Sequence, residues 1–230
     1  MKHYIFSIVL LAGLLASCTT TQLTTTRGEQ YARMYAEDPV TILIMPPINQ
    51  TTFVEAKDYF YTTLYMPLVE KGYYVYSPYM TLQMLEEESA YDSEMFLNSD
   101  LSAFRKILNA DAAIFTIIKS WSRSKMAGSL TCQVEYIIRS TKTGETLYTR
   151  EGEITVDTSV RSGSGGLLGS LIDMAATAIN TASTDKVVAG RLCNAFVLSD
   201  LPEGKYGTQH QSDSSLPAGK SFFKGTTVAK

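Results

Sequence analysis

Val40-Thr41-Ile42-Leu43-Ile44-Met45-Pro46-Pro47 is the most informative stretch of this 230-residue sequence. Its apolar, partly β-branched run is closed by two prolines, a pattern that predicts a short buried strand. The segment from Asn49 to Thr52 supplies capping side chains, so a helix is expected from about Val54 to Lys71. Pro67 lies inside that helical pattern, and the helix should kink or restart there because proline lacks a backbone N–H.

A second strand is expected directly after this helix. Gly72 ends the helix, and Tyr73-Tyr74-Val75-Tyr76 has the aromatic and β-branched composition of a strand. Strand, helix and strand in this order predict a right-handed parallel crossover.

The remainder of the body adds helices and an antiparallel hairpin. Further elements are expected as helices at about 79–87, 101–109 and 186–198 and as a strand at 112–118. Residues 128–139 and 145–156 alternate in polarity, and a short loop ending in Gly144 joins them, which is a hairpin signal. We therefore predict a single layered α/β domain over residues 39–200, with a mixed sheet that begins with the parallel crossover.

The strand at 128–139 has two chemically different faces. Leu130, Cys132, Val134, Tyr136 and Ile138 form an apolar face, which should lie in the core. The intervening positions are largely polar, so the second face should be solvated or covered by a partner; these are Thr131, Gln133, Glu135 and Arg139.

The N-terminus has the pattern of a lipoprotein signal. Lys2 precedes an apolar run from Ile5 to Ala16, which is too short to span a bilayer, and small residues then precede Cys18. We interpret Leu15-Ala16-Ser17-Cys18 as a lipobox, with residues 1–17 as the signal peptide and Cys18 as the lipidated residue. The alternatives are an uncleaved anchor or an ordinary secretory signal. Thr19 after the cysteine favours an outer-membrane location facing the periplasm.

The two flanks of the domain are polar. Residues 18–38 are rich in threonine and are interpreted as a tether, in which twenty residues would span about 65 Å if fully extended. Residues 201–230 are rich in proline, glycine, serine and lysine, a composition that predicts a flexible tail.

Charge and histidine content argue against several functional classes. Twenty basic against 23 acidic residues give a net charge of −3, which disfavours nucleic-acid binding. His3 belongs to the signal and His210 to the expected tail, so a histidine-dependent catalytic or zinc site is not expected in the domain. Cys132 and Cys193 are interpreted as buried free thiols, with a disulfide as the alternative. We predict no catalytic residue, metal or cofactor.

Other motifs are interpreted structurally. The glycine-rich stretch 163–169 lacks the lysine and hydroxyl residue of a phosphate loop, so it is expected to be a tight turn. Leu167 to Ala182 is expected to be a core helix, with a subunit contact or a membrane segment as alternatives. The acidic run Glu86 to Glu88 is expected to be a solvated face.

Tyrosines cluster in and just after the first crossover, where they form our candidate partner interface. Tyrosine is amphipathic and enriched in protein interfaces, although packing within the fold explains the cluster equally well. The candidates are Tyr59, Tyr61, Tyr65, Tyr73, Tyr76 and Tyr79, with Phe60 and Tyr74 nearby.

Four motifs together resemble a bacterial lipoprotein family typified by a meningococcal surface-antigen lipoprotein. They are Met45-Pro46-Pro47-Ile48-Asn49, the segment from Tyr65 to Val75, Gly165-Gly166-Leu167-Leu168-Gly169, and Leu201-Pro202-Glu203-Gly204-Lys205-Tyr206. The resemblance covers roughly residues 18–206. It implies a fold similar to the amino-terminal domain of TolB, to CsgG and to LpoB.

The resemblance also implies a role in contacts between envelope proteins, including a homodimer and complexes with CsgG-like lipoproteins. No catalytic residue is carried over from the family. We therefore expect a lipid-anchored, non-enzymatic assembly component with a role auxiliary to secretion or transport. The alternatives are an LpoB-like activator of a peptidoglycan synthase and, from another class, a carboxylate-dependent envelope hydrolase.

Overall fold

The computed structural model describes residues 25–124, 128–157, 159 and 186–228. The signal peptide, Cys18, the glycine-rich stretch 163–169 and the helix expected at 167–182 lie outside the described residues.

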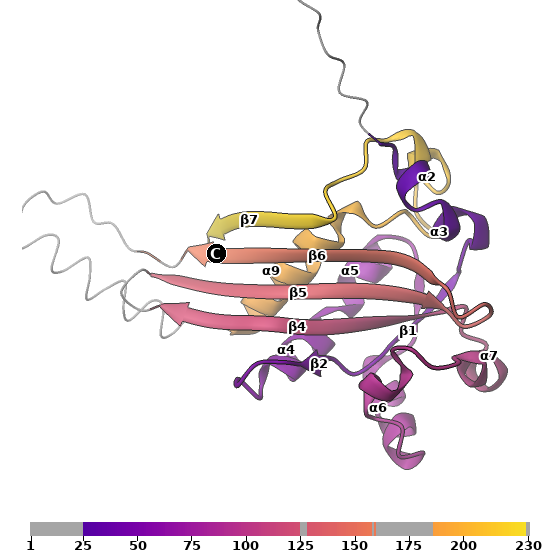
Figure 1. The fold of residues 1–230 in the computed structure, drawn as a ribbon, viewed down its shortest axis with the longest axis horizontal. Helices are drawn as coiled ribbons and strands as arrows, with labels where there is room; N and C mark the ends of the chain where they lie inside the picture. The colour runs from indigo at the N-terminus through magenta and orange to yellow at the C-terminus, as the bar shows by residue number, and fades with distance from the viewer. Residues whose placement is uncertain (1–24, 125–127, 158, 160–185, 229–230) are drawn as a thin grey trace, which may run out of the picture.

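The described chain is built on one mixed sheet of seven strands, in the order β3-β1-β4-β5-β6-β7, with β2 also pairing with β4 (Figure 1). The strands are β1 (Thr41–Ile44), β2 (Ile48–Asn49), β3 (Tyr74–Val75), β4 (Ala112–Ser124), β5 (Ser129–Ser140), β6 (Thr146–Asp157) and β7 (Phe222–Val228). The fold class predicted from the sequence, a layered α/β domain with a mixed sheet, is confirmed.

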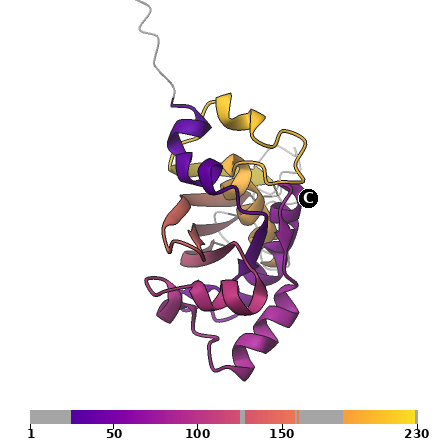
Figure 2. The same cartoon turned by 90° about the vertical axis from the view of Figure 1, so that its right-hand side faces the viewer.

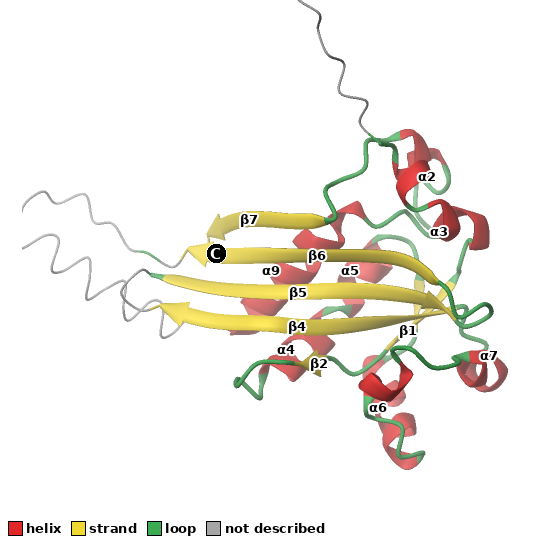
Figure 3. Ribbon diagram, viewed as in Figure 1, coloured by secondary structure: helices red, strands yellow, loops and turns green. Residues whose placement is uncertain are grey.

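Helices cover the two faces of the sheet unequally (Figure 3). The α-helices are α2 (Arg27–Gln30), α3 (Ala32–Glu37), α4 (Ala56–Thr63), α5 (Tyr65–Glu70), α6 (Pro78–Glu87), α7 (Ser102–Leu108) and α9 (Lys186–Val197). Short 3-10 helices are η2 (Ser93–Phe96), η3 (Leu198–Asp200) and η4 (Ser212–Ser215). The main core lies between the sheet and α4, α5 and α9, and a smaller core forms where α6 and α7 meet β1 and β4.

The first crossover forms as predicted. β1 and β3 are parallel, with Ile42 opposite Val75. The helix between them breaks at Leu64 and restarts as α5, so that Pro67 occupies the third position of the new helix. Proline is tolerated there because the first-turn N–H groups have no partner within the helix.

The predicted hairpin also forms, with β5 and β6 antiparallel. The apolar face of β5 is buried, whereas Thr131, Gln133 and Glu135 are only partly buried on the opposite face. Lys119 bridges that polar face, with its Nζ 2.8 Å from Glu135 and 2.6 Å from Glu151. β4 extends to Ser124, beyond the expected end at 118, because its polar second half still pairs with β5.

The prediction of a tether over residues 18–38 is wrong for residues 25–38. This segment forms α2 and α3, and Tyr31 and Met34 enter the core at 3% and 2% exposure. The polar composition concealed two short helices; Met34 in α3 and Tyr31 between the helices enter the core.

The prediction of a flexible tail is wrong for residues 201–228. β7 pairs in parallel with β6, with Phe222 opposite Glu151 and Val228 opposite Asp157. His210 therefore belongs to the fold, with its Nε2 3.3 Å from the Asp38 carboxylate. Both views show the C-terminal segment beside the N-terminal helices (Figures 1 and 2).

Buried charges hold these two segments together, which local composition cannot reveal. Arg27 on α2 donates to Asp200 at 3.1 Å and to Asp213 at 3.2 Å. Burial, reinforced by hydrogen bonds to Asp200 and Asp213 respectively, raises the pKa of Tyr31 and Tyr35, so both hydroxyls stay protonated and donate. We name this set the terminal clasp: Arg27, Tyr31, Tyr35, Asp200 and Asp213.

Cys132 and Cys193 are free thiols buried between β5 and α9. Burial raises the pKa of both thiols, so neither forms a thiolate near neutral pH.

We expect the soluble chain from residue 19 to react with a thiol-specific chromogenic reagent at pH 8 only after denaturation. Two thiols per chain should then react, without prior reduction. Fast labelling of the native protein would contradict the buried thiols, and absence of labelling in denaturant would indicate a disulfide.

Candidate protein-binding groove

A cavity of about 700 Å³ opens beside β3, the edge strand formed by the first crossover. We call it the tyrosine groove and define it by its lining residues. They are Thr62, Tyr65, Val69, Tyr73, Tyr74, Val75, Ser77, Pro78 and Tyr79.

Four consecutive elements build the groove because the chain reverses twice within a few residues. α4 and α5 supply Thr62, Tyr65 and Val69, which are spaced at i, i+3 and i+7 and so share one helical face. β3 supplies the edge, and Pro78 at the first position of α6 turns the chain away from the sheet.

Two buried hydroxyls fix the base of the groove. Tyr73 donates to the Pro202 carbonyl at 2.7 Å, and Tyr61 donates to the Pro78 carbonyl at 2.7 Å. Burial raises the pKa of both phenols, so they remain donors at physiological pH. Because both hydrogen bonds lie within the chain, the base of the groove is formed without a bound partner.

The rim of the groove is exposed and apolar. Tyr74 is 55% exposed and Tyr79 is 76% exposed, and Val69 is 37% exposed. Met66 and Met80, next in sequence to Tyr65 and Tyr79, are also exposed, at 53% and 64%. The lining contains no charged side chain, so covering it costs no ionic desolvation.

The six candidate tyrosines do not form one surface. Tyr65, Tyr73 and Tyr79 line the groove, and Tyr61 supports it from the core. Tyr76 donates instead to the Leu108 carbonyl, beside α7. Tyr59 joins a separate aromatic cluster with Phe53 and Trp121.

Thr62 and Val69 are groove residues that the candidate set omitted. Thr62 lies three residues before Tyr65 and Val69 four residues after it. Residues at these spacings share one face of a helix, so the sequence could have predicted both. Tyr74 lies between buried Tyr73 and Val75, so strict alternation along a strand could have marked it as outward-facing.

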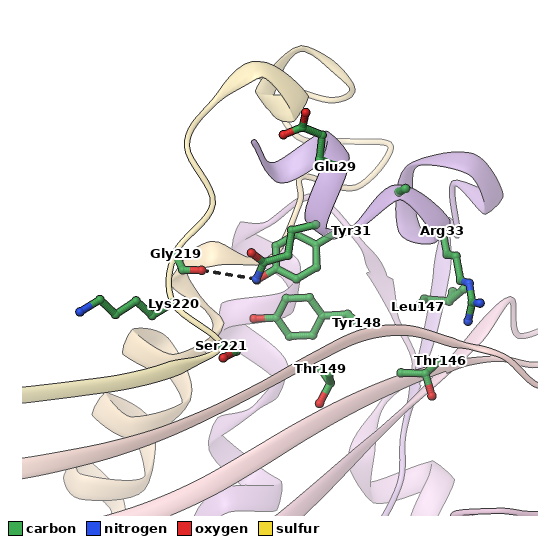
Figure 4. A pocket seen from close by; sticks show the side chains of 12 residues that line it. Glu29, Tyr31, Arg33, Thr146, Leu147, Tyr148, Thr149, Gly219, Lys220 and Ser221 are labelled. Carbon is green, nitrogen blue, oxygen red and sulfur yellow. Dashed lines mark hydrogen bonds between the residues drawn. The ribbon is translucent and has the colours of Figure 1, made fainter. Parts of the chain in front are cut away.

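A second cavity, of about 610 Å³, lies between α2, α3, the start of β6 and the segment from Gly219 to Ser221 (Figure 4). Tyr31 and Tyr148 lie side by side at its base, with ring centroids 4.9 Å apart. Gln30 closes one side by donating to the Gly219 carbonyl at 3.4 Å. Both rings are almost fully buried, so the cavity presents little aromatic surface to a ligand.

Neither cavity holds the pair of carboxylates that a carboxylate-dependent hydrolase would use. The tyrosine groove contains no carboxylate and the second cavity contains one, Glu29, which caps α2. Within the described ranges, no group of three or more His, Cys, Asp or Glu side chains could hold a metal ion. Glu86, Glu87 and Glu88 are exposed at the end of α6.

No helix among the described residues is both long and apolar enough to cross a membrane.

A family profile covers most of the chain. The family described as "Putative lipoprotein GNA1162-like" matches residues 29–203. The chain belongs to this family. The resemblance inferred from the sequence motifs is therefore confirmed, and the protein is placed among lipoproteins. No curated protein matches the chain in sequence.

Several solved structures align with parts of this chain at low sequence identity. Lipoprotein GNA1162 from Neisseria meningitidis is 17% identical with a TM-score of 0.48, and the match covers 64% of this chain and all of that one. The PelC dodecamer from Paraburkholderia phytofirmans is 13% identical with a TM-score of 0.41, over 73% of this chain and 91% of that one. The LpoB C-terminal domain from Salmonella enterica is 13% identical with a TM-score of 0.36, over 56% of this chain and 94% of that one.

Proposed function

We propose that this lipoprotein is a non-enzymatic assembly component of the cell envelope, anchored through Cys18, that binds another envelope protein through the tyrosine groove. Family membership supports the lipoprotein assignment, and the lipobox supports outer-membrane anchoring at Cys18. The observation that carries the binding role is an exposed, uncharged, aromatic cavity at a sheet edge. Aromatic side chains that surround a depression are typical of the energetic centres of protein interfaces.

The folded N-terminal helices bring the domain close to its anchor. Seven residue steps separate Cys18 from Thr25, the first described residue, and they span at most about 25 Å when fully extended. This reach is far shorter than that of the twenty-residue tether expected from composition. The partner should therefore be a membrane-bound protein or the membrane-proximal part of one, in keeping with a CsgG-like lipoprotein complex.

We expect a photo-crosslinking amino acid at position 79 to form a discrete adduct with a partner in intact cells. The matched control is position 107, because Ile107 is 75% exposed and Tyr79 is 76% exposed, on different parts of the surface. Adducts should form from position 79 and be absent from position 107, and mass spectrometry would identify them.

Replacing Tyr74 tests the same surface without a probe. Tyr74→Ala should reduce the yield of the adduct at position 79 severalfold, whereas Tyr91→Ala, at a tyrosine of similar exposure, should leave it unchanged. Equal adducts from positions 79 and 107, or none from position 79, would rule out the groove as the binding surface. The adduct also distinguishes a lipoprotein partner from a peptidoglycan synthase or a second copy.

A further inference from the structure

We propose that the partner binds the tyrosine groove with an extended, uncharged segment that adds to the outer edge of β3 as a further strand. This inference rests on the proposed function and specifies the chemistry of its partner. It is carried by the backbone of β3, by the side chains around it and by the shape of the groove.

The backbone of Val75 is directed away from the rest of the sheet. Tyr74 N–H donates to the Val40 carbonyl at 2.9 Å and Tyr76 N–H donates to the Ile42 carbonyl at 3.3 Å. Because consecutive residues of a strand direct their N–H and C=O groups to opposite sides, those of Val75 face the groove. An extended segment can pair with both groups, as strand-adding peptides do on other sheet edges.

The turn between α5 and β3 is already paired with another part of the chain. Gly204 N–H donates to the Lys71 carbonyl at 2.8 Å, and Tyr206 N–H donates to the Gly72 carbonyl at 2.9 Å. The fold thus uses backbone pairing beside the chain up to Gly72, whereas Val75, 7% exposed at the base of the groove, has no strand on its outer side among the described residues. The added segment would continue along the edge from there.

The side chains around Val75 determine what the segment must carry. A strand directs alternate side chains to one face, so one side chain of the partner would enter between Tyr65, Val69 and Tyr79. With no charge in the lining, a charged side chain would be desolvated there without a counter-ion. The segment is therefore expected to present an aliphatic or aromatic residue and no charged residue at that position.

A second copy of this chain fits the site less well than a foreign segment. A two-fold contact brings the same surface of each copy together. When the groove lies on the two-fold axis, two hollows of about 700 Å³ face one another and leave both unfilled. A protruding extended segment fills the groove, which a copy of the groove cannot do.

The probe for this inference is a phage-displayed library of random twelve-residue peptides, selected on the detergent-solubilised, full-length lipoprotein. Selected peptides should carry an uncharged apolar core. They should bind the Tyr79→Ala variant at least tenfold more weakly than the parent. Their affinity for the Tyr91→Ala variant should equal that for the parent. Selected peptides that bind Tyr79→Ala as well as the parent, or that place a charge in the core, would overturn the proposal.

Backbone N-methylation of the best peptide tests strand addition itself. Methyl groups at alternate residues, those whose N–H faces β3, should weaken binding at least tenfold, whereas methyl groups at the intervening residues should have little effect. A loss of affinity that recurs every three to four residues, or that shows no periodicity, would rule out a strand. If no adduct forms at position 79 in cells, the proposed function fails. If the adduct forms but the effect of N-methylation does not alternate along the peptide, only the proposal of strand addition fails.

Discussion

Gly72→Ala is expected to destabilise the soluble domain by about 2–5 kcal/mol, combining left-handed backbone strain with overpacking. Gly72 has a φ of +82°, which side-chain-bearing residues rarely adopt. A Cβ at this position would lie 2.1 Å from the Gly207 backbone nitrogen and 2.5 Å from its Cα. The close atoms all belong to the backbone of Tyr206 and Gly207, so no flexible side chain can move aside.

Gly144→Ala is the matched control for this substitution. Gly144 also has a positive φ, of +73°, but the nearest atom to its Cβ would be the end of the Arg139 side chain at 3.5 Å. Its cost should therefore be the backbone strain alone, about 1–2 kcal/mol. Urea unfolding followed by circular dichroism measures both variants. Equal losses would contradict the tight contact between Gly72 and Gly207.

Gly72→Ala should also release the segment that packs against it. Tyr206 is hydrogen-bonded to Gly72 and Gly204 to Lys71, so displacing Gly207 breaks the backbone pairing of this segment. Limited proteolysis should cut the variant after Lys205, while the parent and Gly144→Ala resist at that bond. Because Tyr73 is held by the neighbouring Pro202 carbonyl, the variant should also weaken peptide binding in the tyrosine groove.

Arg27→Ala is expected to destabilise the domain by about 3 kcal/mol, because it leaves two buried carboxylates without their cation. The Asp213 side chain is fully buried and that of Asp200 is 6% exposed. Other donors remain, namely the hydroxyls of Tyr31 and Tyr35 and the N–H groups of Gly219 and Glu203. These donors place the expected loss at the lower end of the range for a broken buried pair.

Arg33→Ala provides the comparison within the same region. Arg33 pairs with Glu145 at 3.1 Å, but both side chains are more than half exposed. Exposed ion pairs contribute at most about 1 kcal/mol, so this variant should unfold close to the parent. Urea unfolding at constant pH and salt measures both variants. A similar loss in the two would mean that the terminal clasp contributes no more than a surface ion pair.

Local patterns were sufficient for the central elements. The β-branched run at 40–45 and the alternation at 130–138 each determine which side chains face the core, since a strand has a fixed period of two. The proline at 67 and the glycine at 144 mark a helix restart and a hairpin because their backbone preferences act within a few residues. The lipobox is likewise a local pattern, and the lipidation of Cys18 remains a prediction.

The candidate site could be predicted only in part. Composition indicated a concentration of tyrosines, and helical spacing could have added Thr62 and Val69. Composition could not separate Tyr79, which reaches solvent, from Tyr61, which donates to the Pro78 carbonyl. The position of Pro78 beside Tyr61 is set by the tertiary fold.

The sequence alone was enough for the family, the crossover and the hairpin, and it predicts the lipoprotein signal; each of these rests on short local patterns in the chain. Only the tertiary structure decided that residues 25–38 and 201–228 belong to the fold. A polar segment has no signal of its own for folding, and its order comes from a partner far away. Arg27 meets Asp200 and Asp213 across more than 170 residues, and β7 gains its hydrogen bonds from β6. The same long-range packing leaves the edge of β3 open and shapes the groove beside it.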